Sequence, residues 1–162
     1  MNLESLRTSE SINEVINLYS NMVYRIALSM LKSKTNVDDI YQDVFYSYFK
    51  KRRVFASEEH RKYWIIRTTI NTCKKYWQSA WLKKTVPLND NFIYEKKEEN
   101  LLKEKINELP YKYKIVIHLF YFEDMSIKEI SKSLVLNEGT IRMQLTRGRR
   151  ILKENLGGDF FD

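Results

Sequence analysis

Apolar residues return at spacings of three and four along most of the chain, which is the period of amphipathic α-helices. Ser11 and Glu14 form a capping-box pattern that predicts the start of the first helix. Its apolar stripe is Ile12, Ile16, Tyr19, Val23, Ile26 and Met30. A second stripe covers residues 37–49, and Ser57 is a suitable N-cap for a third helix. These three helices predict one bundle over roughly residues 8–80.

The helical pattern weakens between residues 81 and 100, where Pro87, Asn89 and Asp90 interrupt it. We predict a linker over 81–100. An apolar face resumes at Leu101, and Pro110 suits the first turn of another helix. With only four glycines and two prolines, the chain has little turn chemistry for a β-rich fold. The expected fold is therefore all-α, with domains at 1–80 and 101–162.

The stretch from Ser126 to Arg150 predicts a helix-turn-helix. Ser126 and Glu129 form a second capping box, and Asn137 is a good N-cap for the helix after the turn. One face of that second helix is apolar, and the other face carries arginines. Such a helix can enter the major groove of DNA. A solvated basic surface is the alternative interpretation.

Position along this second helix suggests different roles for the DNA-facing residues. Arg142, Met143 and Thr146 lie in the first turns, where they are best placed to contact base edges. The cations farther along, together with one on the preceding helix, are expected to contact phosphates. The whole predicted set is Lys128, Glu138, Thr140, Arg142, Met143, Thr146, Arg147, Arg149 and Arg150.

Charge and aromatic content indicate a second nucleic-acid surface near the N-terminus. The chain carries +7, and residues 48–84 hold eleven Lys or Arg, two Glu and all three tryptophans. Basic groups interleaved with rings suit unpaired DNA, because cations follow phosphates and rings stack on bases. Tyr63 and Trp77 fit the core stripe. For Trp64, which lies off that stripe, base stacking and partial burial are equally good interpretations. The candidate contacts are Arg53, Phe55, Arg61, Lys62, Trp64, Arg67, Asn71, Lys74 and Lys75.

Several classes of function are disfavoured. Cys73 is the only cysteine, so an intramolecular disulfide is impossible, and its place on the apolar stripe predicts a core residue. His60 and His118 lack zinc-ligand spacing, and Asp38, Asp39 and Asp43 on one helix make a poor magnesium site. No phosphate-binding loop or nucleophile motif is present. We expect a cytoplasmic protein that is not an enzyme and has no cofactor or metal.

Three segments, in order, resemble bacterial sigma factors of the sigma-70 family. They are residues 38–45 (DDIYQDVF), residues 61–71 (RKYWIIRTTIN) and the motifs between Leu109 and Arg149. A two-domain chain without a middle domain looks like the extracytoplasmic-function (ECF, group IV) class. Three features depart from the family pattern or vary within it: the turn over 134–137 lacks the glycine that the family often has, Gly148 stands where alanine is common, and Met143 and Thr146 lie on the expected DNA face, where the family varies.

The resemblance implies a mechanism and a set of partners. The N-terminal domain would dock on the β′ coiled coil of core RNA polymerase and hold a base of the melted −10 element near residues 55–71. The C-terminal domain would sit on the β flap and read the −35 element, and the linker would thread toward the active-site and RNA-exit channels. An anti-sigma factor, able to hold the protein at the membrane, is an expected partner of a chain that is monomeric when free. The polymerase-binding residues would be Asp38, Asp39, Gln42, Asp43 and, nearby, Phe45.

Two other functions compete with this one. A free-standing helix-turn-helix regulator would bind DNA without polymerase, but it would need a dimer interface or ligand pocket in the N-terminal half. A non-catalytic single-strand or RNA-binding protein would use residues 48–84, but it would leave the helix-turn-helix without a role.

Overall fold

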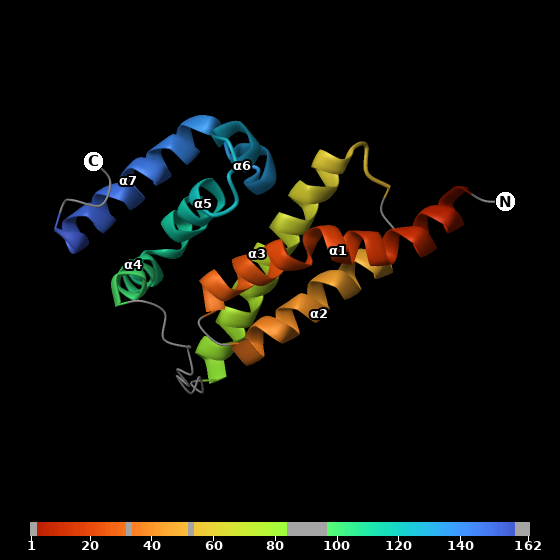
Figure 1. Cartoon of the computed structure of the whole chain (residues 1–162), viewed down its shortest axis with the longest axis horizontal. Helices are drawn as coiled ribbons and strands as arrows, with labels where there is room; N and C mark the ends of the chain where they lie inside the picture. Colours follow the sequence, from red (N-terminus) through yellow and green to blue (C-terminus); the bar gives the residue numbers. More distant parts are fainter. Residues whose placement is uncertain (1–2, 32–33, 52–53, 84–96, 158–162) are drawn as a thin grey trace. The chain divides into compact units, whose positions relative to one another are not determined.

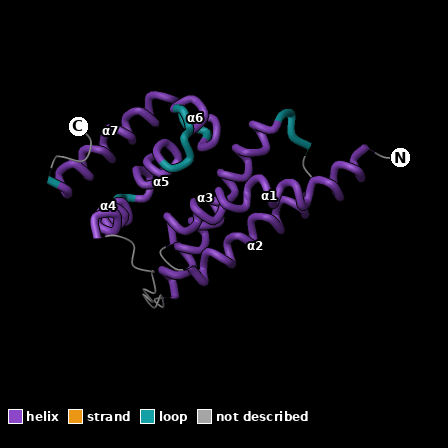
Figure 2. Tube along the Cα trace, in the orientation of Figure 1, coloured by secondary structure: helices purple, strands orange, loops and turns teal. Residues whose placement is uncertain are grey.

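The computed structural model describes residues 3–31, 34–51, 54–83 and 97–157, and the regular elements in these ranges are α-helices (Figure 2). The predicted all-α class is confirmed. The chain divides into two compact units, Met1–Pro87 and Leu88–Asp162. No helix in the described part is long and apolar enough to cross a membrane. The helices are α1 (Leu3–Leu31), α2 (Lys34–Lys51), α3 (Glu58–Lys83), α4 (Lys97–Glu108), α5 (Tyr111–Tyr121), α6 (Ile127–Leu134) and α7 (Glu138–Leu156).

In the N-terminal unit, α1, α2 and α3 each pack against the other two (Figure 1). Each helix contributes its apolar stripe, because residues three and four apart share one face. Val23, Ile40 and Ile66, one from each helix, have no exposed surface. Cys73 is also buried, as its place on the stripe of α3 predicts.

Two helix ends differ from the sequence-based expectation. α1 begins at Leu3, so Ser11 lies inside the helix and the predicted capping box at Ser11 is wrong. Residues 3–10 contain neither glycine nor proline, so nothing stops the helix from extending toward the N-terminus. α3 continues to Lys83, past the expected domain end at residue 80, because no helix breaker precedes Pro87.

In the C-terminal unit, α7 packs against α4, α5 and α6, and the predicted helix-turn-helix is formed by α6 and α7 (Figure 1). Gly148 allows the close approach of α7 to α5. A Cβ atom at this position would lie 3.2 Å from Ile117 Cγ1 and 3.3 Å from Tyr113 Cβ. The apolar face of α7 that was predicted from its spacing is buried: Ile141, Leu145 and Leu152.

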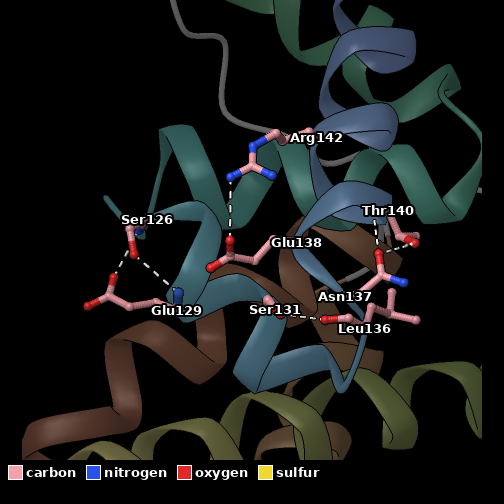
Figure 3. Close-up of polar contacts among 8 residues, drawn as sticks. All are labelled: Ser126, Glu129, Ser131, Leu136, Asn137, Glu138, Thr140 and Arg142. Carbon is pink, nitrogen blue, oxygen red and sulfur yellow. Dashed lines mark hydrogen bonds and ion pairs between the residues drawn. The ribbon is translucent and has the colours of Figure 1, made fainter.

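Side-chain caps begin both helices of this motif (Figure 3). At α6, the Glu129 backbone N–H donates to Ser126 Oγ at 3.1 Å, and the Ser126 N–H donates to Glu129 Oε2 at 2.9 Å. At α7, Asn137 Oδ1 accepts from the Thr140 backbone N–H and from Thr140 Oγ1, each at 2.8 Å. Both predicted caps are confirmed, and they fix where the second helix starts.

The turn between α6 and α7 contains backbone strain. Val135, the C-cap of α6, has φ 55° and ψ 47°, the left-handed conformation that glycine adopts at little cost. A β-branched side chain is among the least suited to it. The Ser131 hydroxyl donates to the Leu136 carbonyl and the Leu136 N–H donates to the Ser131 carbonyl, so the turn keeps this shape without glycine.

We expect Val135→Gly to stabilise the C-terminal unit by about 1 kcal/mol, because the left-handed strain is removed from the folded state. The gain is smaller than the strain itself, since glycine also makes the unfolded chain more flexible. Urea unfolding followed by circular dichroism measures this change. Leu136→Gly, one residue along, provides the control and should be destabilising; a destabilised Val135→Gly would contradict the strain assignment.

Candidate functional site

The outward face of α7 is polar and basic, and it lies opposite the buried face that packs on the rest of the unit. Met143, Thr146 and Arg150 are separated by three and four residues, so they share one surface on the exposed side. Arg142 and Arg147 flank this surface and are also exposed, as is Lys128 on α6. The structure therefore brings the main predicted DNA-facing residues of α7 onto one surface.

Among the residues that the structure describes, Arg142 pairs only with its own helix. Its Nη2 lies 3.4 Å from Glu138 Oε2, one turn earlier, and 60% of the Arg142 side chain is exposed (Figure 3). An exposed pair of this kind contributes about 0–1 kcal/mol. Arg142 can therefore leave Glu138 for a guanine edge at little cost, while Glu138 remains at the helix start, where the helix dipole favours a carboxylate.

Two hydroxyls of the predicted set are already engaged. Thr140 is half-buried, and its Oγ1 donates to the cap at Asn137. Thr146 Oγ1 donates to the Arg142 carbonyl at 2.8 Å but lies on the exposed face. Thr140 thus helps to position the helix, whereas Thr146 keeps its methyl group and its acceptor capacity available for DNA.

The described basic and aromatic candidates of the N-terminal unit fall on more than one side of α3. Trp64, Asn71 and Lys75 follow at spacings of seven and four, so they form one outward strip. Lys62 lies one turn before the buried Ile66 and therefore beside the core. Arg67 is half-buried and Lys74 is exposed. Arg53 lies outside the described residues.

Phe55 and Trp64 belong to an aromatic cluster with Tyr48 of α2. The Tyr48 and Phe55 rings are nearly parallel, with centroids 5.9 Å apart and an interplanar angle of 7°. Trp64 meets both rings edge-on, again at 5.9 Å. All three side chains are partly exposed, so Trp64 combines partial burial with an accessible edge. This arrangement offers apolar ring surface next to the strip on α3.

Arg61 belongs to a polar network at the start of α3. Its Nη2 lies 2.9 Å from Glu58 Oε2, and Tyr19 of α1 donates from its hydroxyl to Glu58 Oε1 at 3.2 Å. Burial, and next the negative charge of Glu58, raises the pKa of Tyr19 to about 12. Burial also raises the pKa of Tyr48. Glu58 therefore joins Tyr19 of α1 to Arg61 on its own helix, and any contact of Arg61 with DNA would compete with this network.

The Tyr19 pKa predicts a loss of stability at alkaline pH. Between the unfolded value of about 10 and the folded value of about 12, the unfolded chain has lost a proton that the folded chain keeps. The free energy of unfolding should therefore fall as pH rises through this window, by at most about 1.4 kcal/mol per pH unit.

This loss is measured by urea unfolding of the N-terminal unit, followed by tryptophan fluorescence, between pH 9 and 12. Tyr19→Phe has no phenolic proton and should show a shallower decline over the same range, while lysine titration affects both proteins equally. Identical slopes would contradict the assignment.

α2 carries an acidic face that matches the expected polymerase-docking residues. Asp38, Asp39, Gln42 and Asp43 are all exposed. Phe45 is only 4% exposed and packs against the Tyr41 ring, with centroids 4.9 Å apart. The expectation that Phe45 contributes to this surface is therefore corrected: it belongs to the core and supports the acidic face from within.

Sequence reasoning missed Tyr46, which is 65% exposed on α2. It lies three residues after Asp43 and four after Gln42, so it shares their face. The sequence contains that spacing, but Tyr46 stands among aromatic residues of the apolar stripe, such as Phe45 and Tyr48, and no local signal separates it from them. Lys50 Nζ lies 5.8 Å from the Tyr46 ring centroid, at the far end of this face.

The structure also corrects the position of Trp77. Spacing placed it on the buried stripe with Tyr63, Ile66, Ile70 and Cys73, but it is 60% exposed. Periodicity tells which side of a helix a residue lies on. It does not tell whether another helix still covers that side near the C-terminal end of α3, where Trp77 lies. Trp77 therefore adds an exposed ring near Lys74, which lies three residues earlier on α3.

Comparison with known proteins identifies the two units. Residues 15–83 match the family model of Sigma-70 region 2, and residues 99–152 match Sigma-70, region 4. The chain is 27% identical over 140 residues to the RNA polymerase sigma factor SigV of Bacillus subtilis (strain 168), covering 82% of this chain and 83% of the relative. It is 30% identical over 129 residues to SigZ, an RNA polymerase sigma factor of the same organism, covering 75% of this chain and 73% of the relative.

A solved structure shows the same fold. The sigma factor RpoE from Bartonella quintana, in complex with the anti-sigma factor NepR, matches with a TM-score of 0.75 at 18% identity. The match covers 93% of this chain and 99% of that chain.

Proposed function

The chain belongs to the extracytoplasmic-function group of the sigma-70 family, and from this premise we propose how its residues divide the work of transcription initiation. Sigma factors are non-enzymatic initiation factors, and this one directs promoter-specific transcription by core RNA polymerase. Core polymerase, promoter DNA and anti-sigma factors are the partners of ECF sigma factors. The observation that carries the proposal is that acidic and basic residues lie on different helices: an acidic face on α2, and basic surfaces on α3 of the same unit and on α7 of the C-terminal unit.

In the proposed mechanism, the N-terminal unit performs two tasks. The acidic face of α2, formed by Asp38, Asp39, Gln42 and Asp43, docks on the β′ coiled coil. The strip on α3 and the neighbouring aromatic cluster receive the melted −10 strand. Flipping a base out of the stack costs a few kcal/mol, and stacking on a ring contributes about 1–3 kcal/mol. Stacking on Trp64 and Phe55 can therefore offset the cost of flipping one base.

The C-terminal unit reads the −35 element with α7 and sits on the β flap. Arg142, Met143 and Thr146 face base edges near the start of the helix, and Arg147 and Arg150 contact phosphates. The linker that joins the two units threads toward the active-site and RNA-exit channels of the polymerase.

Regulation by an anti-sigma factor is part of the same proposal. The structurally similar RpoE is bound by the anti-sigma factor NepR. A corresponding partner of this chain would cover its polymerase-docking surfaces and, where that partner is membrane-anchored, hold the chain at the membrane. When free, the chain is expected to be a monomer, because each task needs a single copy.

Run-off transcription tests this function. Purified core RNA polymerase from the host transcribes fragmented genomic DNA with and without the protein. New discrete transcripts that share spaced −35 and −10 elements support the sigma function. No transcripts, together with no complex on mixing with core polymerase, would favour a free-standing regulator.

Substitutions on α7 should separate reading of sequence from positioning. Arg142→Ala is expected to relax preference at one base pair of the −35 element by about 1–3 kcal/mol, because an arginine fork discriminates guanine. Arg147→Ala should weaken binding equally at all sequences and lower the salt dependence. Holoenzyme binding to a library of −35 variants measures both effects. Equal losses at every variant for Arg142→Ala would contradict base reading.

A further inference from the structure

Arg149 differs from the other arginines of α7 in its surroundings. It is half-buried, whereas Arg142, Arg147 and Arg150 are exposed. Its Nε donates to the Tyr121 hydroxyl of α5 at 2.6 Å. Its guanidinium carbon lies 5.3 Å from the Phe120 ring centroid and 5.5 Å from the Tyr121 ring centroid. One hydrogen bond and two cation–π contacts therefore hold this side chain.

The two rings that hold Arg149 are themselves ordered against each other. Phe120 and Tyr121 meet edge-on, with centroids 5.0 Å apart and an interplanar angle of 77°. Tyr121 is 40% exposed, so the guanidinium is held at the surface and not in the core. We call Phe120, Tyr121 and Arg149 the arginine clamp.

The clamp leaves the phosphate-binding part of the guanidinium available. Arginine has five N–H donors, of which one is on Nε. Within the part of the chain that the structure describes, the Arg149 side chain hydrogen bonds only through Nε. The two terminal nitrogens keep a fork of donors, which matches two oxygens of a phosphate.

Distance along α7 shows which part of DNA Arg149 can reach. Arg149 follows Glu138, the first residue of α7, by eleven positions, or about 16 Å at 1.5 Å per residue. The major groove is about 12 Å wide. When the first turns of α7 face the bases, Arg149 lies at the edge of the groove, beside the sugar-phosphate backbone.

We propose that Tyr121 and Phe120 are positioning residues that orient Arg149 to bind one phosphate of the duplex. This phosphate contact then sets the register of α7 in the groove. The inference rests on the proposed DNA-reading role of α7. Because the side chain is ordered before binding, less conformational entropy is lost when the phosphate is gripped. Phosphate contacts position a protein without specifying sequence, so the clamp should act equally on all sequences.

A double-mutant cycle on the full-length chain tests the clamp. The probe is a fluorescein-labelled duplex pool of randomised sequence, titrated at several salt concentrations and read by anisotropy. Arg149→Ala should weaken binding about tenfold and lower the slope of log K against log salt by about one. Tyr121→Phe keeps both rings and removes the hydroxyl, so it should weaken binding about threefold. In the Arg149→Ala background, Tyr121→Phe should add nothing.

Two further variants separate the effect of the guanidinium fork from the effect of positive charge alone. Arg149→Lys restores the charge but not the fork, so it should recover the salt slope and only part of the affinity. Lys153→Ala removes a neighbouring exposed charge of α7, and its loss should be the same with Tyr121 or Phe at position 121. Thermal unfolding of each variant shows whether the unit remains folded.

Three results would overturn the clamp. They are unchanged DNA affinity in Arg149→Ala, a Tyr121→Phe loss that persists without Arg149, and no duplex binding by the wild-type chain. Duplex binding with the expected cycle but no transcription with core polymerase would overturn the sigma function and leave the clamp standing. The two failures are therefore distinguishable.

Discussion

Gly148→Val is expected to destabilise the C-terminal unit by about 3 kcal/mol, near the upper end of overpacking effects. A Cβ atom at this position would already lie 3.2 Å from Ile117 Cγ1 and 3.3 Å from Tyr113 Cβ. Valine adds two methyl groups to that crowded contact, so α7 must move away from α5. Such a movement would also displace the DNA-reading face of α7.

The tryptophans separate the two units in this experiment. All three tryptophans, at positions 64, 77 and 81, lie in the N-terminal unit. Gly148→Val should therefore lower the urea midpoint seen by circular dichroism for the C-terminal unit and leave the tryptophan fluorescence transition unchanged. An unchanged dichroism midpoint would show that the α5–α7 contact tolerates a larger side chain.

Gly148→Ala is the matched control. Alanine improves helix propensity by about 1 kcal/mol over glycine, while its single methyl group must displace Ile117 and Tyr113 by a few tenths of an ångström. These effects oppose each other, so the stability should stay within about 1 kcal/mol of wild type.

Tyr46→Ala is expected to weaken binding to core RNA polymerase by about 2 kcal/mol, or roughly 30-fold. Tyr46 is 65% exposed and shares the acidic face of α2. In a complex with a basic partner, the acidic residues of this face would form polar contacts around the Tyr46 ring. An exposed tyrosine within a polar rim is the usual composition of an interface hot spot. Titration of labelled protein with core polymerase measures the effect.

Leu18→Ala is a matched control for Tyr46→Ala. Leu18 is 55% exposed on α1, and its substitution removes an exposed apolar side chain outside the acidic face of α2. It should bind core polymerase as wild type does. Tyr46→Phe should retain most of the affinity, since ring area supplies most of the contact energy. Equal binding by Tyr46→Ala and wild type would place the docking contact elsewhere on α2.

Much of the fold could be predicted from local patterns. The three- and four-residue spacing of apolar side chains identified the helices, and the caps at Ser126 and Asn137 located the start of α6 and α7. Ser11 shows the limit of the same reasoning. A capping pattern is only one choice among local conformations, and an uninterrupted helix-forming stretch before it extended α1 to Leu3.

The candidate site was predictable to the extent that it depends on one helix at a time. The outward position of Arg142, Met143 and Thr146 follows from the period of α7 and the apolar face opposite. Phe45 was placed with the docking residues and Trp77 on the buried stripe, and Tyr46 was not singled out, because exposure depends on which other helices lie alongside. Tyr46 and Trp77 are exposed and Phe45 is buried, although all three are aromatic.

The sequence by itself determined the all-α class, the helix-turn-helix and the charged surfaces, because helical period, capping and charge are properties of neighbouring residues. Only the tertiary structure decided that Arg149 is held by Tyr121, that Tyr19 hydrogen bonds to Glu58, and that Gly148 gives α7 its place against α5. The contacts of Arg149 and Gly148 join residues some thirty positions apart, and the hydrogen bond from Tyr19 to Glu58 joins α1 to the start of α3. Such pairings are selected by the packing of whole helices, which no local pattern specifies.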